Sequence, residues 1–240
     1  MRCLELFCGT KSLGRAFERI GWEVVSLDID PKCNPTHCHD IMSWDYRVYP
    51  SNFFNFVFAS PVCQHYSIAR TTGGPRDLIR SDGLVRRTIE IISYFVDCKW
   101  AFENPQSGLL KTRIHLIGGL PFFDTSYCRY GFPYRKTTRL WTNLTLSLRE
   151  PCTIRNPCSA VVNKRHPMTA QQGRRGSDAG DVKNSCSQRR LYMIPDGLCD
   201  EIANAANLAV LETDGSGEGA DASTPAAFVS AELSSNPRDL

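Results

Sequence analysis

The sequence predicts an α/β fold with an open, mostly parallel sheet and helices on both faces. The chain opens with a strand, a glycine turn, a helix and a second strand, which is the first unit of such sheets. Further short apolar runs then alternate with a helix that is apolar on one side. At 240 residues, the chain is long enough for one domain with a substantial core.

The first unit spans residues 3–30. "CLELFC" is a short apolar run, followed by Leu13, Phe17 and Ile20 at helical spacing and by Gly21 as a helix stop. "WEVVSLDID" is a second strand that ends in acidic residues. These features predict a strand, a helix and a parallel strand in succession.

Later elements follow from the same patterns. The helix over 81–96 has Ser81 or Asp82 as its cap, and Pro195 lies near the start of the helix over 191–210. Strands are expected over 53–60, 98–104, 125–132 and 138–144, and the four tryptophans (Trp22, Trp44, Trp100 and Trp141) are expected in the core.

The charge is unevenly distributed. Between residues 129 and 190 there are 13 Lys and Arg against 3 Asp and Glu, whereas from 191 onward there are 1 basic and 9 acidic residues. The basic block indicates a polyanion partner, and a solvated basic loop is the alternative. We expect a loop-rich appendage over 146–190, a helix packed on the core over 191–210 and a disordered acidic tail over 211–240.

Two classes of protein are disfavoured. No apolar run approaches the ~18 residues of a membrane span, and the N-terminus lacks a secretory signal, so an intracellular protein without a membrane anchor is expected. The 11 cysteines are scattered and odd in number, which favours reduced thiols.

The glycine turn and the second strand predict a cofactor site. "LELFCGTKSLG" lets a ligand approach the backbone, and Asp28 at the end of the next strand suits ribose hydroxyls. The full G-x-G-x-x-G is absent, so a ligand with one adenosine is favoured over a dinucleotide. A purely structural turn is the alternative.

A thiol and a carboxylate each follow a predicted strand. Cys63 lies in "SPVCQHYS" and Glu103 in "FENP". Alone, such a cysteine is usually inert and such a glutamate is usually a surface residue or a cap. Their occurrence together at strand carboxyl ends favours a nucleophile with a partner acid.

These three blocks, in this order and spacing, resemble those of the C5-cytosine DNA methyltransferases, especially a compact branch found in phages and giant viruses. "YCRYGFPYRKTTRLWTN" is similar as well. The resemblance covers residues 1–145 and implies a Rossmann-like methyltransferase fold that uses S-adenosylmethionine as methyl donor. Residues 146–190 would then be a reduced target-recognition region.

The resemblance also implies roles for individual residues. Cys63 would add to cytosine C6, Glu103 would engage N3 and the exocyclic amine, and the target base would be flipped out of duplex DNA. Asn104, Lys136 and Arg139 would complete the catalytic set. The implied cofactor residues are Phe7, Cys8, Gly9, Thr10, Asp28, Ile29, Asp40, Ile41, Ser60 and Pro61.

The sequence departs from the family pattern in three places. Val62 replaces the second proline before the cysteine, Lys11 replaces a common glycine, and Tyr134 and Thr138 replace residues of a basic block. An RNA cytosine-5 methyltransferase and a catalytically silent nucleic-acid-binding protein are therefore kept as alternatives. The oligomeric state is left open, although a monomer is compatible with the sequence.

No metal is assigned to the site. Cys152, Cys158 and His166 would bind zinc only with a fourth ligand such as Cys186, and their C-x5-C spacing is loose. The cluster Cys33, His37, Cys38 and His39 is interpreted as ordinary loop residues, and His65 is expected to contact backbone or solvent.

Overall fold

The computed structural model describes residues 1–68, 70, 74–170 and 187–215. Seven strands in this part of the chain form one sheet, in the order β3-β2-β1-β4-β5-β7-β6. The first five strands in this order are parallel to one another, and β7 is antiparallel to both β5 and β6. The predicted fold class is confirmed. The strands are β1 (Arg2–Leu6), β2 (Glu23–Asp28), β3 (His37–Cys38), β4 (Phe56–Ala59), β5 (Lys99–Pro105), β6 (Phe122–Ser126) and β7 (Thr137–Thr142).

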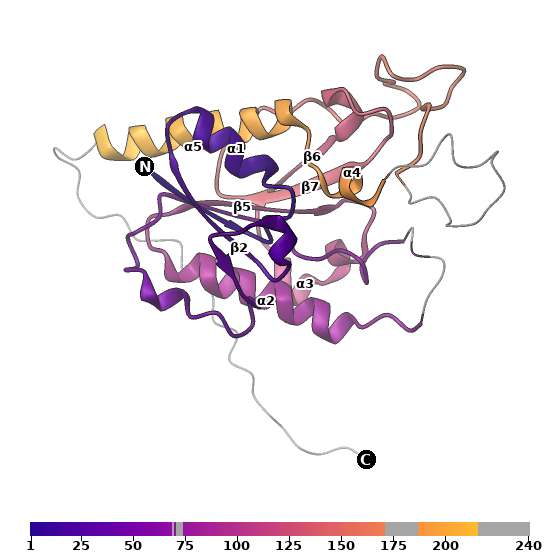
Figure 1. The fold of residues 1–240 in the computed structure, drawn as a ribbon. Helices are drawn as coiled ribbons and strands as arrows, with labels where there is room; N and C mark the ends of the chain where they lie inside the picture. Colours follow the sequence, from indigo (N-terminus) through magenta and orange to yellow (C-terminus); the bar gives the residue numbers. More distant parts are fainter. Residues whose placement is uncertain (69, 71–73, 171–186, 216–240) are drawn as a thin grey trace.

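Helices cover both faces of the sheet (Figure 1). On one face lie α1 (Ser12–Arg19) and α5 (Asp196–Gly215), and on the other lie α2 (Leu78–Tyr94) and α3 (Ile114–Ile117). The short helical segments are η1 (Pro31–Cys33), η2 (Tyr46–Val48), η3 (Leu109–Thr112), η4 (Tyr127–Tyr130) and α4 (Gln188–Tyr192).

Each buried strand supplies side chains to both faces because successive residues of a strand point in opposite directions. In β4, Phe56 and Phe58 pack with Phe17 of α1, whereas Val57 and Ala59 pack with Val85 of α2. The sheet is therefore the wall between two hydrophobic clusters. All four tryptophans are buried, as predicted.

Helix α2 begins one turn earlier than predicted. Its cap is Asp77, whose carboxylate accepts a hydrogen bond from the Arg80 N–H at 2.9 Å. Ser81 and Asp82 are not caps but buried residues inside the helix, where Asp82 forms an ion pair with Arg113. A buried carboxylate needs such a partner, and the local sequence gives no indication that one is available.

The strand predicted over 125–132 is only partly correct. β6 ends at Ser126, and Tyr127–Tyr130 form the 3-10 turn η4, which Gly131 ends at φ +87°. The aromatic residues of this segment raised its strand propensity. In the fold, Tyr127 and Cys128 are both buried, in two different clusters.

The predicted C-terminal helix is divided in two. Pro195 separates α4 from α5, and Leu198, Ile202 and Ala206 of α5 are buried beside α1. α5 continues to Gly215, beyond the predicted end at residue 210. The remainder of the predicted acidic tail and residues 171–186 lie outside the described residues. Among the described residues, every helix is too short or too polar to cross a lipid bilayer.

Candidate active site

One cleft of about 2550 Å³ opens at the carboxyl ends of the central parallel strands. β1 lies between β2 and β4, so the order of the strands reverses at this point, which is where open α/β sheets bind ligands. A typical small-molecule pocket is on the order of 300–1,000 Å³. The cleft therefore has room for two ligands side by side.

The turn after β1 is held in an uncommon backbone conformation. Phe7, Gly9 and Lys11 have φ values of 56°, 46° and 54°, in the left-handed region that favours glycine. The Gly9 N–H donates to Oδ2 of Asp28 at 2.8 Å, and the Asp30 N–H donates to Oδ1 at 2.9 Å. Two backbone amides thus fix the Asp28 carboxylate at the cleft.

The structure brings the whole predicted cofactor set together. Ile29 is 63% exposed although it is apolar, and its side chain lies in the cleft. Asp40 accepts a hydrogen bond from the Met42 N–H at 3.0 Å, next to buried Ile41. The predicted residues that line the cleft are Phe7, Cys8, Gly9, Thr10, Asp28, Ile29, Asp40, Ile41, Ser60 and Pro61.

Glu5 is a site residue that the sequence analysis missed. It is only 3% exposed, and burial raises the pKa of its carboxyl group to about 7, although hydrogen bonds from the Gly14 and Leu13 amides act in the opposite direction. Glu5 lines the cleft, and its buried Oε2 has no hydrogen-bond partner among the described residues. The sequence feature that could have indicated this role is that Glu5 is the single acidic residue inside the apolar run "CLELFC".

Cys63 lies just beyond β4, partly exposed in the same cleft. Burial raises the pKa of its thiol; the Lys136 ammonium acts to lower this pKa, and Glu103 acts to raise it. The Cys63 carbonyl accepts hydrogen bonds from the Tyr66 and Ser67 amides, at 3.0 and 2.8 Å. These bonds turn the chain sharply after the thiol.

The loop after Cys63 is tied to the start of α2. Arg76 donates to the carbonyls of His65 and Ser67, both at 2.8 Å. Nδ1 of His65 accepts a hydrogen bond from the Asp77 N–H at 2.9 Å. His65 therefore contacts backbone, as predicted.

Glu103 is buried, with 6% exposure, and three groups hold its carboxylate. Its Oε1 accepts hydrogen bonds from the Tyr127 hydroxyl at 3.2 Å and from the Thr138 hydroxyl, and lies 3.9 Å from Nζ of Lys136. Thr138, which departs from the family pattern, thus positions the carboxylate.

Asn104 connects the two strand ends. Its side-chain amide donates to the Pro61 carbonyl at 2.9 Å, while the residue itself is fully buried. This bond fixes the segment that leads to Cys63. Asn104 is therefore a positioning residue, because its contact is with the chain rather than with the cleft.

Comparison with known proteins identifies the family. No protein-family model matches the chain. A protein of Frog virus 3 (isolate Goorha), described as "Probable DNA (cytosine-5)-methyltransferase", is 31% identical over 218 residues, which cover 84% of this chain and 98% of the viral protein. The chain belongs to the DNA (cytosine-5)-methyltransferase family.

Solved structures with lower identity are also similar to this methyltransferase. Entamoeba histolytica methyltransferase EhMeth is 18% identical, with a TM-score of 0.48 over 68% of this chain. S. pombe Dnmt2 methyltransferase is 17% identical, with a TM-score of 0.43 over 62% of this chain. The chain spans 61% and 53% of these two structures. The family assignment rests on the viral relative.

The structure does not place Arg139 in the active site of the methyltransferase. Its guanidinium forms two hydrogen bonds to Asp124 on β6, at 2.7 and 2.8 Å, and lies 3.6 Å from the ring centre of Phe122. Lys136 does line the cleft, whereas Arg139 is not among the lining residues. The structure thus places Arg139 outside the cleft, in contrast to the predicted catalytic set.

The C-terminal segment returns to the active site, which the sequence analysis did not foresee. Arg189, Leu191 and Tyr192 of α4 line the cleft. The Leu191 carbonyl lies 3.4 Å from Nζ of Lys136 and accepts a hydrogen bond from it. No local pattern could reveal this contact, because the two residues are far apart in the sequence.

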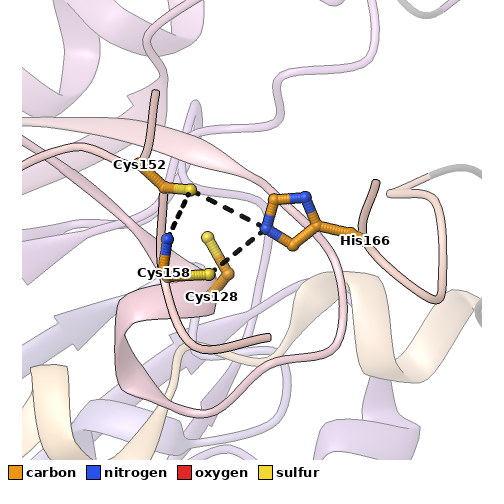
Figure 2. A group of neighbouring side chains, drawn as sticks. All are labelled: Cys128, Cys152, Cys158 and His166. Atoms are coloured by element: carbon orange, nitrogen blue, oxygen red, sulfur yellow. Dashed lines mark hydrogen bonds between the residues drawn. The ribbon is translucent and has the colours of Figure 1, made fainter. Parts of the chain in front are cut away.

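A cluster of metal-ligand side chains lies beside the cleft. Cys152, Cys158 and His166 come together, and the fourth member is Cys128, which the sequence analysis did not consider (Figure 2). Cys186, then named as the fourth ligand, lies outside the described residues. Among the described residues, Cys33, His37, Cys38 and His39 form no such group.

Proposed function

We propose that this protein transfers a methyl group from S-adenosylmethionine to C5 of cytosine in DNA, through a covalent bond between Cys63 and C6. The observation that carries the proposal is the shared cleft: Cys63 and Glu103 line it together with the glycine turn and Asp28. Membership of the family supports the same reaction.

The residues of the cleft suit S-adenosylmethionine, which when bound supplies a methyl group on a positively charged sulfur. Asp28 presents a fixed carboxylate for ribose hydroxyls, and exposed Ile29 offers an apolar surface for adenine. Oε2 of Glu5 is a buried acceptor without a partner among the described residues, and a cationic amino group would satisfy it. Lys11 lines the cleft, and its ammonium is held by a hydrogen bond to the Asn34 carbonyl.

The chemistry requires activation of the cytosine ring, because C5 is a poor nucleophile on its own. The Cys63 thiolate forms a bond to C6, and the electron pair displaced from the C5–C6 double bond makes C5 able to attack the methyl group. Glu103 lines the same cleft as Cys63, and its carboxyl group can hydrogen-bond N3 and the exocyclic amine. Loss of the C5 proton to a base then returns the electrons and releases the thiolate.

The base must leave the duplex for this reaction, since C6 is stacked inside it. Five basic residues of the cleft could hold the flanking phosphates, and phosphate contacts of this kind fix the position of a protein on DNA. They are Arg70, Arg80, Arg135, Lys164 and Arg165. We further propose that residues 1–145 form the catalytic core and residues 146–190 a reduced target-recognition region.

The decisive experiment is transfer of a labelled methyl group from S-adenosylmethionine to duplex DNA. We expect label at cytosine C5, no transfer by Cys63→Ser, and normal transfer by the control Cys38→Ser, whose thiol lies outside the cleft. A trapped complex with DNA that contains 5-fluorocytosine would report the covalent bond.

Three results would contradict the proposal. Label on tRNA but not on DNA would assign RNA as the substrate, and DNA binding without any methyl transfer would identify a silent nucleic-acid-binding protein. Full activity of Cys63→Ser would exclude the covalent mechanism.

A further inference from the structure

The cysteine and histidine cluster beside the cleft has the composition of a zinc site. The Sγ atoms of Cys128, Cys152 and Cys158 and a ring nitrogen of His166 all lie within 4.8 Å of one another. Nε2 of His166 is 3.4 Å from Sγ of Cys158 and 3.8 Å from Sγ of Cys152 (Figure 2). Three sulfurs and one imidazole nitrogen form a common ligand set for structural zinc.

The distances agree with a tetrahedral ion. Zinc binds sulfur at about 2.3 Å and imidazole nitrogen at about 2.0–2.1 Å, so tetrahedral ligands are separated by about 3.6–3.8 Å. The two measured distances between His166 and the sulfurs are close to that range. Only small shifts of the side chains would be needed to coordinate one ion.

Hydrogen bonds within the chain hold the segments that carry Cys128, Cys152 and Cys158. Arg129 donates to the carbonyls of Glu150 and Asn156, at 3.1 and 2.7 Å, and so braces the loop between Cys152 and Cys158. The Cys158 N–H donates to Sγ of Cys152 at 3.4 Å. A hydrogen bond of this type stabilises a thiolate that binds metal.

His166 is presented by a tight hairpin. Val162 and Arg165 exchange two backbone hydrogen bonds, of 2.8 and 3.0 Å, across Asn163 and Lys164. Asn163 and Lys164 have φ values of 49° and 64°, as a type I′ turn requires. This turn directs the histidine from the next position toward the three thiols.

The surrounding segment has little apolar packing among the described residues. Its hydrophobic cluster consists of the three cysteines, with only Ala160 and Val161 packed against it. The described part of the segment contains no strand beyond the isolated Val162–Arg165 bridge. A loop with so little apolar surface is the kind of structure that a metal or a disulfide holds together.

We propose that Cys128, Cys152, Cys158 and His166 bind one structural zinc ion. The site joins η4, which lies between β6 and β7, to the loop-rich segment on the rim of the cleft. Lys164 and Arg165 directly precede the histidine and line the cleft, so the ion also fixes two positive charges where a phosphate backbone would pass. The site does not depend on the proposed reaction.

The first test is metal content. The full chain, without an affinity tag and purified under reducing conditions, is expected to contain one zinc per chain by mass spectrometry. Cys158→Ser and His166→Ala should reduce zinc content at least tenfold. Cys38→Ser, an exposed thiol outside the cluster, should retain it, and His166→Cys should rescue binding because it supplies another zinc ligand.

A second readout covers the case in which a variant does not fold. Cobalt added to the zinc-free wild-type chain should give the intense visible bands of tetrahedral cobalt and the charge-transfer bands of thiolate ligands. Removal of zinc by a chelator should also speed trypsin cleavage after Arg155, Lys164 and Arg165, whereas the sheet stays resistant.

Several results would overturn the proposal. They are absence of zinc after addition of the metal to reduced protein, full zinc content in both Cys158→Ser and His166→Ala, and an octahedral cobalt spectrum. A disulfide between two of these cysteines in protein freshly purified under reducing conditions would also exclude the site.

Discussion

At the scale of single residues, the environment of Cys63 determines when the thiol can react. Burial raises its pKa, and two neighbouring charges of opposite sign then act on it: Lys136 lowers the pKa and Glu103 raises it. In the proposed mechanism the thiolate is the reacting species. Lys136 therefore provides the charge that favours the reactive form.

Lys136→Met tests this balance. Loss of the ammonium should raise the pKa of Cys63 further, so the rise of kcat/KM with pH should move to higher pH and the rate at pH 7 should fall. Each pKa unit changes the thiolate fraction about tenfold below the pKa. Methyl transfer measured from pH 6 to 10 reports the shift.

Lys136→Arg should restore most of the normal profile, and Lys111→Met is the control because Lys111 is exposed and outside the cleft. An unchanged pH profile in Lys136→Met would show that the ammonium does not act on the thiol.

Glu5 gives a prediction about stability without cofactor. Its pKa is about 7 in the folded chain against 4.5 for the unperturbed group. As pH rises, the carboxyl group therefore loses its proton at lower pH in the unfolded state than in the folded state. The free energy of unfolding falls as pH rises from about 4.5 to about 7. Glu5→Gln removes this loss. The free energy of unfolding of the variant minus that of wild type should therefore increase from pH 5 to pH 8, by at most about 3 kcal/mol.

Urea unfolding at the two pH values measures the difference. Glu18→Gln is the matched control, because Glu18 is exposed on α1 and should show no such trend. A Glu5→Gln difference that stays constant with pH would mean that the buried carboxyl group does not titrate in this range.

At the scale of elements, alternation along β7 decides which residues reach the site. The Thr138 hydroxyl donates a hydrogen bond to Glu103, whereas the side chain of its neighbour Arg139 pairs with Asp124 on β6 instead of reaching the site. The resemblance to the family located both residues in the right block of sequence. Only the register of β7 between β5 and β6 assigns one to the site and the other to the sheet.

Arg139→Met should therefore destabilise the fold more than it affects the reaction. The two partners are 14% and 22% exposed, so removal of the guanidinium leaves Asp124 poorly solvated. We expect a loss of about 1–3 kcal/mol in the free energy of unfolding and kcat/KM within about threefold of wild type.

Arg135→Met provides the opposite control, since Arg135 is exposed and lines the cleft. It should weaken DNA binding and leave stability nearly unchanged. A loss of more than about tenfold in kcat/KM for a folded Arg139→Met would return Arg139 to the catalytic set.

At the scale of the whole molecule, the lining of the cleft is basic, with ten Lys and Arg against five Asp and Glu. The basic block of the sequence supplies cleft residues from segments far apart in the chain, including Arg135, Lys164 and Arg189. The sheet and its two hydrophobic clusters form the rigid support, and the rim carries the charges. Binding of DNA should therefore depend steeply on salt concentration.

Lys164→Gln should reduce the slope of log K against log salt by about 1, because one phosphate contact is lost. Fluorescence anisotropy with duplex DNA at several salt concentrations gives the slope, and Lys111→Gln should leave it unchanged. Equal slopes for wild type and Lys164→Gln would place the DNA elsewhere on the surface.

Much of the fold and of the active site could be predicted from the sequence, because those features depend on local patterns. The strand, turn and helix that begin the chain, and the thiol and carboxylate that follow β4 and β5, are each encoded within about ten residues. Parallel strands bring their carboxyl ends to one edge, so the motifs meet in the same cleft. The resemblance to the C5-cytosine methyltransferases is carried by the same short blocks.

The tertiary structure alone decided three other features: the face to which Arg139 points, the return of α4 to the cleft and the approach of Cys128 to Cys152, Cys158 and His166. Each depends on contacts between segments far apart in the chain. Such contacts are fixed by the packing of the whole sheet and its helices, and nothing in the neighbouring sequence specifies them.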